Sequence, residues 1–304
     1  MKNVLFVSCL FLTLGLVSCN KEAKTEKADA SLIRFSLGGE FAAMTKGASE
    51  VTTGNLSSIY VNATTGTSGA EVTTAPGFAN VVFSKSGDNF VANQYWPNSN
   101  PSYHFYASNV SLTHGASGAT VSPADASTDI VVGYIASPTY KSSNSFTLDH
   151  IFAQVGTCQM NAPENYAVNG LKISLQPIIS GTYNLQSGSW TSKGAAGAAT
   201  YIFGTAGAGV NIAANGNSTS ADNDLWLVPG TYQLTATYTE TRGDFTSDTI
   251  TQVCNVDIQQ GKNNNIVGKV TADLATGIVF SVVVTPWGVN NIGAGDPVSF
   301  NDPS

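Results

Sequence analysis

The most regular feature of the chain is an alternation of apolar and polar residues over short stretches. Ile33, Phe35 and Leu37 alternate with polar residues, and segments 171–175 and 232–238 repeat the same period of two. This period is typical of half-buried β-strands. Clusters of Gly, Asn, Ser and Thr separate the stretches, and no segment keeps the apolar period of 3.6 that marks a helix. The pattern predicts an all-β protein.

The predicted strands are numerous enough to form two domains. Many short strands pack naturally as antiparallel sandwiches, and 304 residues are enough for two of them. Residues 161–168 contain a proline, two asparagines and a glutamate, which favours a linker. We therefore predict an N-terminal β-sandwich over residues 31–162 and a C-terminal β-sandwich with a tail over residues 163–304.

The N-terminal residues have the pattern of an export signal. Lys2 precedes an apolar run that ends at Val17, too short to span a membrane comfortably, so residues 1–18 are predicted to be a signal peptide. The segment ending in Ser18-Cys19 resembles the bacterial lipoprotein signal. That resemblance implies that Cys19 carries acyl chains such as palmitate, with residues 19–30 as a polar tether. An ordinary signal peptide with a chance cysteine is the alternative.

Charge and motifs narrow the classes of function. The net charge of −7 and the 11% of charged residues argue against a nucleic-acid partner, which calls for clustered Lys and Arg. Three His and four Cys without clustered spacing predict no metal and no cofactor. The chain contains no G-x-S-x-G, H-E-x-x-H or P-loop motif, and His150 sits in an apolar strand that suits a structural role. We expect a protein that is not an enzyme.

Two further groups of residues leave alternatives open. After export, Cys158 and Cys254 are the cysteines of the body; they can form one disulfide or remain as thiols in apolar strands. Aromatic residues gather over segments 95–96 and 103–106, where they can stack on sugar rings or fill a core. Alternation within a strand favours the core.

Several motifs, in order, resemble a known family. Residues 95–97 read YWP and are followed by YHFYA at 103–107; DIVVG at 129–133 precedes FTLDHIFAQV at 146–155; and VTPW closes the last strand at 284–287. The set resembles the fimbrillin-like family of Bacteroidetes, which are lipoprotein-derived subunits of type V pili and related surface proteins. The resemblance covers most of the exported chain.

The resemblance implies a fold of two transthyretin-like antiparallel β-sandwich domains in tandem. It also implies a structural or accessory subunit of a surface fimbria, exported as a lipoprotein to the cell outer membrane and serving adhesion. A protease trims such subunits, and a strand from the next subunit fills the opened groove. The implied partners are other fimbrial subunits in a head-to-tail polymer, outer-membrane lipid before trimming, and a host or bacterial surface ligand. The alternative is a non-polymerising surface lipoprotein that binds glycan or a host protein.

The resemblance also assigns candidate processing residues. The family is often cut after an arginine, and the matching position here is Lys46 in Thr45-Lys46-Gly47-Ala48. Arg34 is the nearest arginine but lies inside the first predicted strand, so it ranks lower. Trimming after Lys46 would remove the strand that carries Ile33, Phe35 and Leu37.

The donor strand is sought at the C-terminus. Val298 and Phe300 alternate with Ser299 after a Gly- and Asn-rich stretch, so both side chains can point into a groove. A frayed terminus is the alternative for this segment.

Overall fold

The computed structural model describes residues 32–38, 54–65, 76–96, 103–115, 118–271 and 277–286. The candidates Cys19, Lys46, Val298 and Phe300 lie outside these residues, as do the segments 1–18 and 19–30. Strands make up all the regular secondary structure of the described residues, so the all-β prediction is confirmed. The described part of the chain holds no helix of the length and apolarity needed to cross a membrane.

The N-terminal body is one eight-stranded sheet in the order β10-β8-β5-β2-β3-β4-β1-β9. Its first and last strands, β10 and β9, are joined by only two residues, so the sheet bends back on itself around a core. The strand bounds are β1 Leu32–Leu37, β2 Ser58–Thr65, β3 Pro76–Ser86, β4 Asn89–Tyr95, β5 Tyr103–Ser108, β8 Val131–Ile135, β9 Ser143–Phe146 and β10 Asp149–His150.

The C-terminal body is a sandwich of two sheets around a second core. One sheet contains β11 Ala153–Asn161, β17 Asn217–Thr219, β18 Leu225–Leu227, β22 Lys262–Val270 and β23 Ile278–Pro286. The other contains β12 Ala167–Leu175, β15 Thr200–Phe203, β16 Val210–Ile212, β19 Gly230–Arg242, β20 Phe245–Thr246 and β21 Ile250–Ile258. Along β19, Tyr232, Leu234, Ala236 and Tyr238 are buried while the residues between them face outward, as the period of two predicts.

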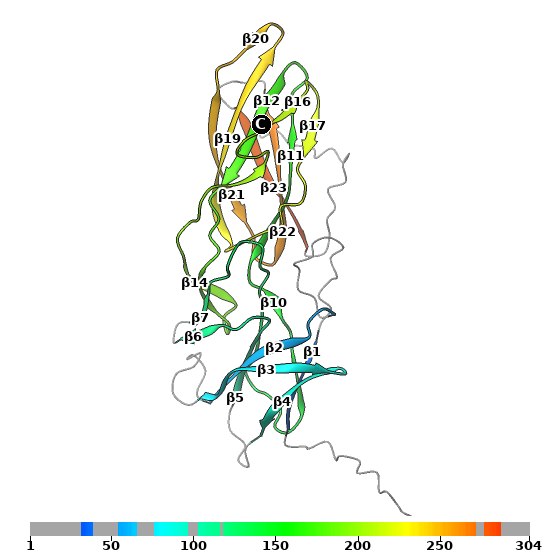
Figure 1. The fold of residues 1–304 in the computed structure, drawn as a ribbon, viewed down its shortest axis with the longest axis vertical. Coiled ribbons are helices and arrows are strands. Elements are labelled where there is room, and N and C mark those ends of the chain that lie inside the picture. Colours follow the sequence, from blue (N-terminus) through cyan, green and yellow to red (C-terminus); the bar gives the residue numbers. More distant parts are fainter. Residues whose placement is uncertain are drawn as a thin grey trace, which may run out of the picture.

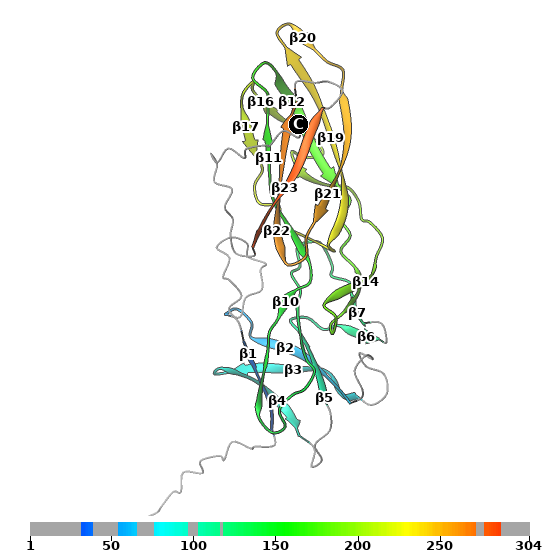
Figure 2. The same ribbon diagram turned by 180° about the vertical axis from the view of Figure 1, so that it is seen from behind.

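A small third sheet joins the two bodies. It runs β14-β13-β7-β6, with β6 Thr113–Gly115 and β7 Gly118–Val121 from the first half and β13 Gly181–Asn184 and β14 Ser189–Lys193 from the second. Beside it the Trp190 ring nitrogen donates to the Ile151 carbonyl at 2.9 Å. The molecule is elongated, with the eight-stranded sheet at one end and the β19–β20 hairpin at the other (Figures 1 and 2).

The boundary between the two bodies differs from the predicted one. It was expected after residue 162, but β11 pairs in parallel with β22 and packs its side chains into the C-terminal core. Residues 162–166 therefore connect two strands of the same sandwich, and the change of body falls between His150 and Ala153. The transthyretin-like topology of each body stays a prediction.

Cys158 and Cys254 are both free thiols. Of the two alternatives left open by the sequence, the structure therefore has the thiols and not the disulfide. Cys158 is buried on β11 in one sheet of the C-terminal sandwich, whereas Cys254 is half-buried on β21 in the opposite sheet. Burial raises the pKa of the Cys158 thiol far above its usual range. Because the thiolate is the reactive form, this thiol is inert while the protein is folded.

Thiol labelling checks this arrangement. In a protein that starts at residue 20, iodoacetamide at mildly alkaline pH should label Cys254 and spare Cys158 in the native state. Both should label in concentrated guanidinium without reductant, as read by peptide mass spectrometry. If neither residue labels until a reductant is added, the two form a disulfide and the described arrangement is wrong.

Candidate assembly site around strand β1

Strand β1 is held on both sides by other strands. It pairs antiparallel with β4, where Phe35 lies opposite Phe90, and parallel with β9, where Leu37 lies opposite Phe146. The Gly38 amide continues the second ladder by donating to the Phe146 carbonyl at 2.8 Å. Because β4 and β9 meet in the sheet only through β1, its removal would leave a slot with unpaired backbone groups on both walls.

Phe35 occupies the centre of the N-terminal core. The ring is fully buried, and its centroid lies 5.1 Å from that of Phe83, 4.9 Å from Phe105 and 4.8 Å from Phe146. Such edge and tilted contacts stabilise aromatic pairs beyond the area they bury. Ile33 is also buried, and burial of each of these two side chains contributes roughly 1.5–3 kcal/mol. Leu37 is half-buried against the same core.

The outer face of β1 is polar and is crossed by one hydrogen bond. Ser143 Oγ on β9 donates to Asn89 Oδ1 on β4 at 3.0 Å, which bridges the two strands that flank β1. Arg34 on this face is half-buried and pairs with Val91 and Ser143 in the two ladders. The peptide bond after Arg34 therefore lies within a strand paired on both sides, a poor substrate for a protease until β1 is released.

Most of the aromatic residues in segments 95–96 and 103–106, beside this site, belong to the core. Trp96 is 4% exposed, and its ring packs against Tyr103, Phe105 and Tyr140. The core interpretation is therefore confirmed for Trp96 and Phe105, while Tyr95 is half exposed on β4. The rings that surround Phe35 come from β3, β5 and β9; period two predicts that they face inward but not that they meet.

His150, for which the sequence predicts a structural role, lies in a buried polar contact. Its Nδ1 lies 3.0 Å from Asp129 Oδ1, both side chains are buried, and its ring stacks on Trp226 at a centroid distance of 6.4 Å. Asp149, the neighbour in sequence, is not the partner in this contact. Among the described residues, no group of three or more His, Cys, Asp or Glu is placed to hold a metal ion.

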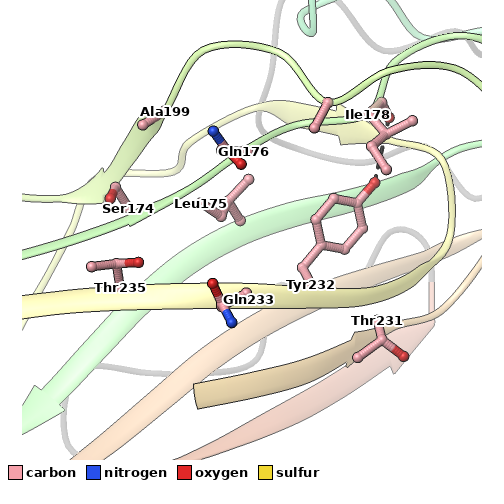
Figure 3. A pocket seen from close by; sticks show the side chains of 10 residues that line it. Ser174, Leu175, Gln176, Ile178, Ala199, Thr231, Tyr232, Gln233 and Thr235 are labelled. Atoms are coloured by element: carbon pink, nitrogen blue, oxygen red, sulfur yellow. Dashed lines mark hydrogen bonds between the residues drawn. The ribbon is translucent and has the colours of Figure 1, made fainter. Parts of the chain in front are cut away.

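A hollow lies on the C-terminal body, beside the end of β12 and the start of β19. It encloses about 500 Å³ and is flanked by the side chains of Gln176 and Gln233 (Figure 3). Tyr232 lines it and donates its hydroxyl to the Val228 carbonyl at 2.7 Å. The described lining carries no charged side chain, so this hollow offers hydrogen bonds and apolar contact.

Comparison with known proteins identifies the family. The fimbrillin-like family model matches residues 42–287, which is most of the chain. The chain belongs to the fimbrillin-like family. A search of curated proteins finds no significant match.

This fimbrillin-like chain is similar to several solved structures, one of which supports its fold. It is similar to a fimbrial protein from Bacteroides vulgatus, with 14% identity, a TM-score of 0.55, and coverage of 84% of this chain and 99% of that one. It also matches a candidate cell adhesion protein from Bacteroides ovatus, with 16% identity, a TM-score of 0.46, and coverage of 86% and 99%. At this identity the first match supports the shared fold alone.

Replacing Phe35 tests the importance of β1 for the N-terminal core. Phe35→Ala should lower the free energy of unfolding by about 3–5 kcal/mol, because it leaves a cavity among three aromatic rings. Tyr95→Ala is the control, since that ring is half exposed on the neighbouring strand β4 and its loss should cost about 0.5 kcal/mol or less. Guanidinium unfolding measures both; equal effects of the two changes would contradict the central role of Phe35.

Proposed function

We propose that this protein is a structural or accessory subunit of a cell-surface fimbria that serves adhesion, and that it has no catalytic role. Membership of the fimbrillin-like family supports a fimbrial subunit or adhesin at the cell surface. In this proposal the precursor is exported as a lipoprotein, acylated at Cys19 in the outer membrane, and trimmed after Lys46. The observation that carries the proposal is the placement of β1 between β4 and β9.

Trimming after Lys46 would leave β1 without a covalent link to the rest of the body. Leu32–Leu37 contains no cysteine, so only its two ladders and its buried side chains would retain it. A strand held by non-covalent contacts alone can be exchanged for another of matching shape, which is strand addition between subunits. A contact in which one subunit donates a segment and the next subunit supplies the groove is heterologous, so it repeats head to tail and builds a filament.

The C-terminal segment resembles β1 in the residues that matter for the exchange. β1 fully buries only Ile33 and Phe35, a β-branched residue and a phenylalanine two positions apart. Val298 and Phe300 repeat that order and spacing, with Ser299 between them. In an extended strand, residues two apart face the same side, so the tail offers side chains of similar kind to the same two cavities.

Limited proteolysis of a protein that starts at residue 20 tests this proposal. A Lys-specific protease should cut after Lys46, release the fragment that contains β1, and produce a ladder of detergent-resistant multimers on an unboiled gel. Lys46→Gln should abolish both fragment release and multimers, whereas Lys85→Gln, at an exposed lysine of β3, should change neither. N-terminal sequencing identifies the cut.

The outcomes separate the candidate roles. Release of the fragment from a protein that stays monomeric would contradict a polymerising subunit and favour a tip component. Absence of cutting near Lys46 would favour the anchored lipoprotein that binds glycan or a host protein.

The donor strand has its own test. Phe300→Asp should leave cutting unchanged and abolish multimers, because a carboxylate would enter the site that Phe35 vacates. Asn301→Asp introduces the same charge one residue further on and should preserve the ladder. If Phe300→Asp protein still polymerises, Phe300 is not the donated side chain.

A further inference from the structure

The β19–β20 hairpin lies at the end of the molecule opposite β1 (Figures 1 and 2). Its residues line a cavity that contains a buried carboxylate. Its volume is about 330 Å³, and Glu240 and Phe245 are among its lining residues. Glu240 is 2% exposed, whereas Phe245 is 63% exposed, the highest value for a large apolar side chain in the described residues. A buried acid beside an exposed ring at the tip of a long molecule needs an explanation.

The Glu240 carboxylate is only half satisfied. Its Oε2 accepts a hydrogen bond from Arg242 Nη2 at 3.2 Å, while its Oε1 is buried without a hydrogen-bond partner. The guanidinium of Arg242 is also committed elsewhere, since it stacks 3.6 Å above the centroid of the Tyr166 ring. A buried carboxylate oxygen without a donor is costly, so this one is suited to a donor supplied from outside.

The rest of the lining indicates the chemistry of that donor. Asp248 adds a second carboxylate at the exposed side, so with Glu240 and Arg242 the cavity has a formal charge of −1. Phe245 and Ile250 supply apolar walls. An apolar wall that ends at two carboxylates matches an alkyl chain that ends in a cation, and an aromatic face adds attraction for that cation.

We propose that this cavity binds a lysine side chain from a second copy of the chain. The ammonium group donates to Glu240 Oε1 and lies beside the Asp248 carboxylate. The alkyl stem packs against Phe245 and Ile250. The choice of a second copy as the partner rests on the proposed function, whereas the preference for an ammonium group rests on the cavity alone.

The sequence narrows the identity of the lysine. The chain has two arginines, Arg34 within β1 and Arg242 in the lining of the cavity itself. Because both are already placed, the cation that a second copy supplies would be a lysine. Lys85 and Lys141 are the described lysines of the N-terminal body, and both are exposed. Lys141 precedes β9 by two residues and so borders the groove that a donated strand would fill. A head-to-tail contact would bring this region of one copy to the distal hairpin of the next, and we assign the lysine as Lys141.

Carbodiimide cross-linking tests the assignment, because this reagent joins a carboxylate to an amine in direct contact. Equal amounts of 14N- and 15N-labelled protein, trimmed and untrimmed, are treated, and mixed-isotope peptides are sought by mass spectrometry. A peptide that joins Lys141 to Asp248 or Glu240 is expected. Lys141→Gln should abolish it and Lys85→Gln should preserve it. Its absence from both samples overturns the proposal.

The same experiment separates this inference from the proposed function. Multimers without the Lys141 cross-link would leave the fimbrial role standing and refute the lysine contact. The cross-link without multimers would support the contact and refute polymerisation.

An NMR titration with Nα-acetyl-lysine methylamide tests the cavity in the monomer. The probe should shift the signals of Phe245 and Asp248, and its Nε-acetylated form should not. Glu240→Gln and Asp248→Asn should each lower the affinity for the probe about tenfold. Asp244 is an exposed residue of the same hairpin, and Asp244→Asn should leave the affinity unchanged. Asp248 is exposed, so its variant remains informative if Glu240→Gln disturbs folding. Equal shifts with the neutral form would contradict an ammonium site.

Discussion

The packing of Phe35 among Phe83, Phe105 and Phe146 is the contact on which the N-terminal body depends. These rings come from four strands, and β1 is the strand that joins β4 to β9. The apolar contact and the backbone ladders thus act at the same place. Loss of the ring contacts would expose the backbone ladders to water, and loss of the ladders would expose the rings. We therefore expect the ring contacts and the ladders of β1 to form together.

The junction between the bodies joins the N-terminal sheet to the rest of the chain by direct contacts. A third apolar cluster joins Tyr106 and Phe152 to Trp226, and the small sheet draws its strands from both halves. His150 lies at this junction, held by Asp129 and stacked on Trp226. The protein is therefore a continuous scaffold that joins the β1 groove at one end to the β19–β20 hairpin at the other (Figure 1).

Local alternation predicted the strands and the inward face of β1, because period two depends only on neighbouring residues. The domain boundary depends instead on pairing between strands that are far apart in the sequence. β11 pairs with β22, about a hundred residues away, and a proline-containing turn within one sandwich has the same composition as a linker. The half-satisfied Glu240 could not be found from sequence either. Glu240 occupies one of the alternating buried positions of β19. That its Oε1 lacks a hydrogen-bond donor depends on which side chains from other segments surround it, and the local pattern does not give these.

The two ladders of β1 have a mechanical consequence. Their hydrogen bonds run across the strand, so tension along the strand axis loads many of them together in shear, while the rings around Phe35 resist sliding. A pull directed away from β4 and β9 would instead break the bonds one after another. A strand in this position is strong against axial force and weak against peeling, so the proposed exchange of β1 for a donated strand would proceed by peeling and end in a contact that resists traction.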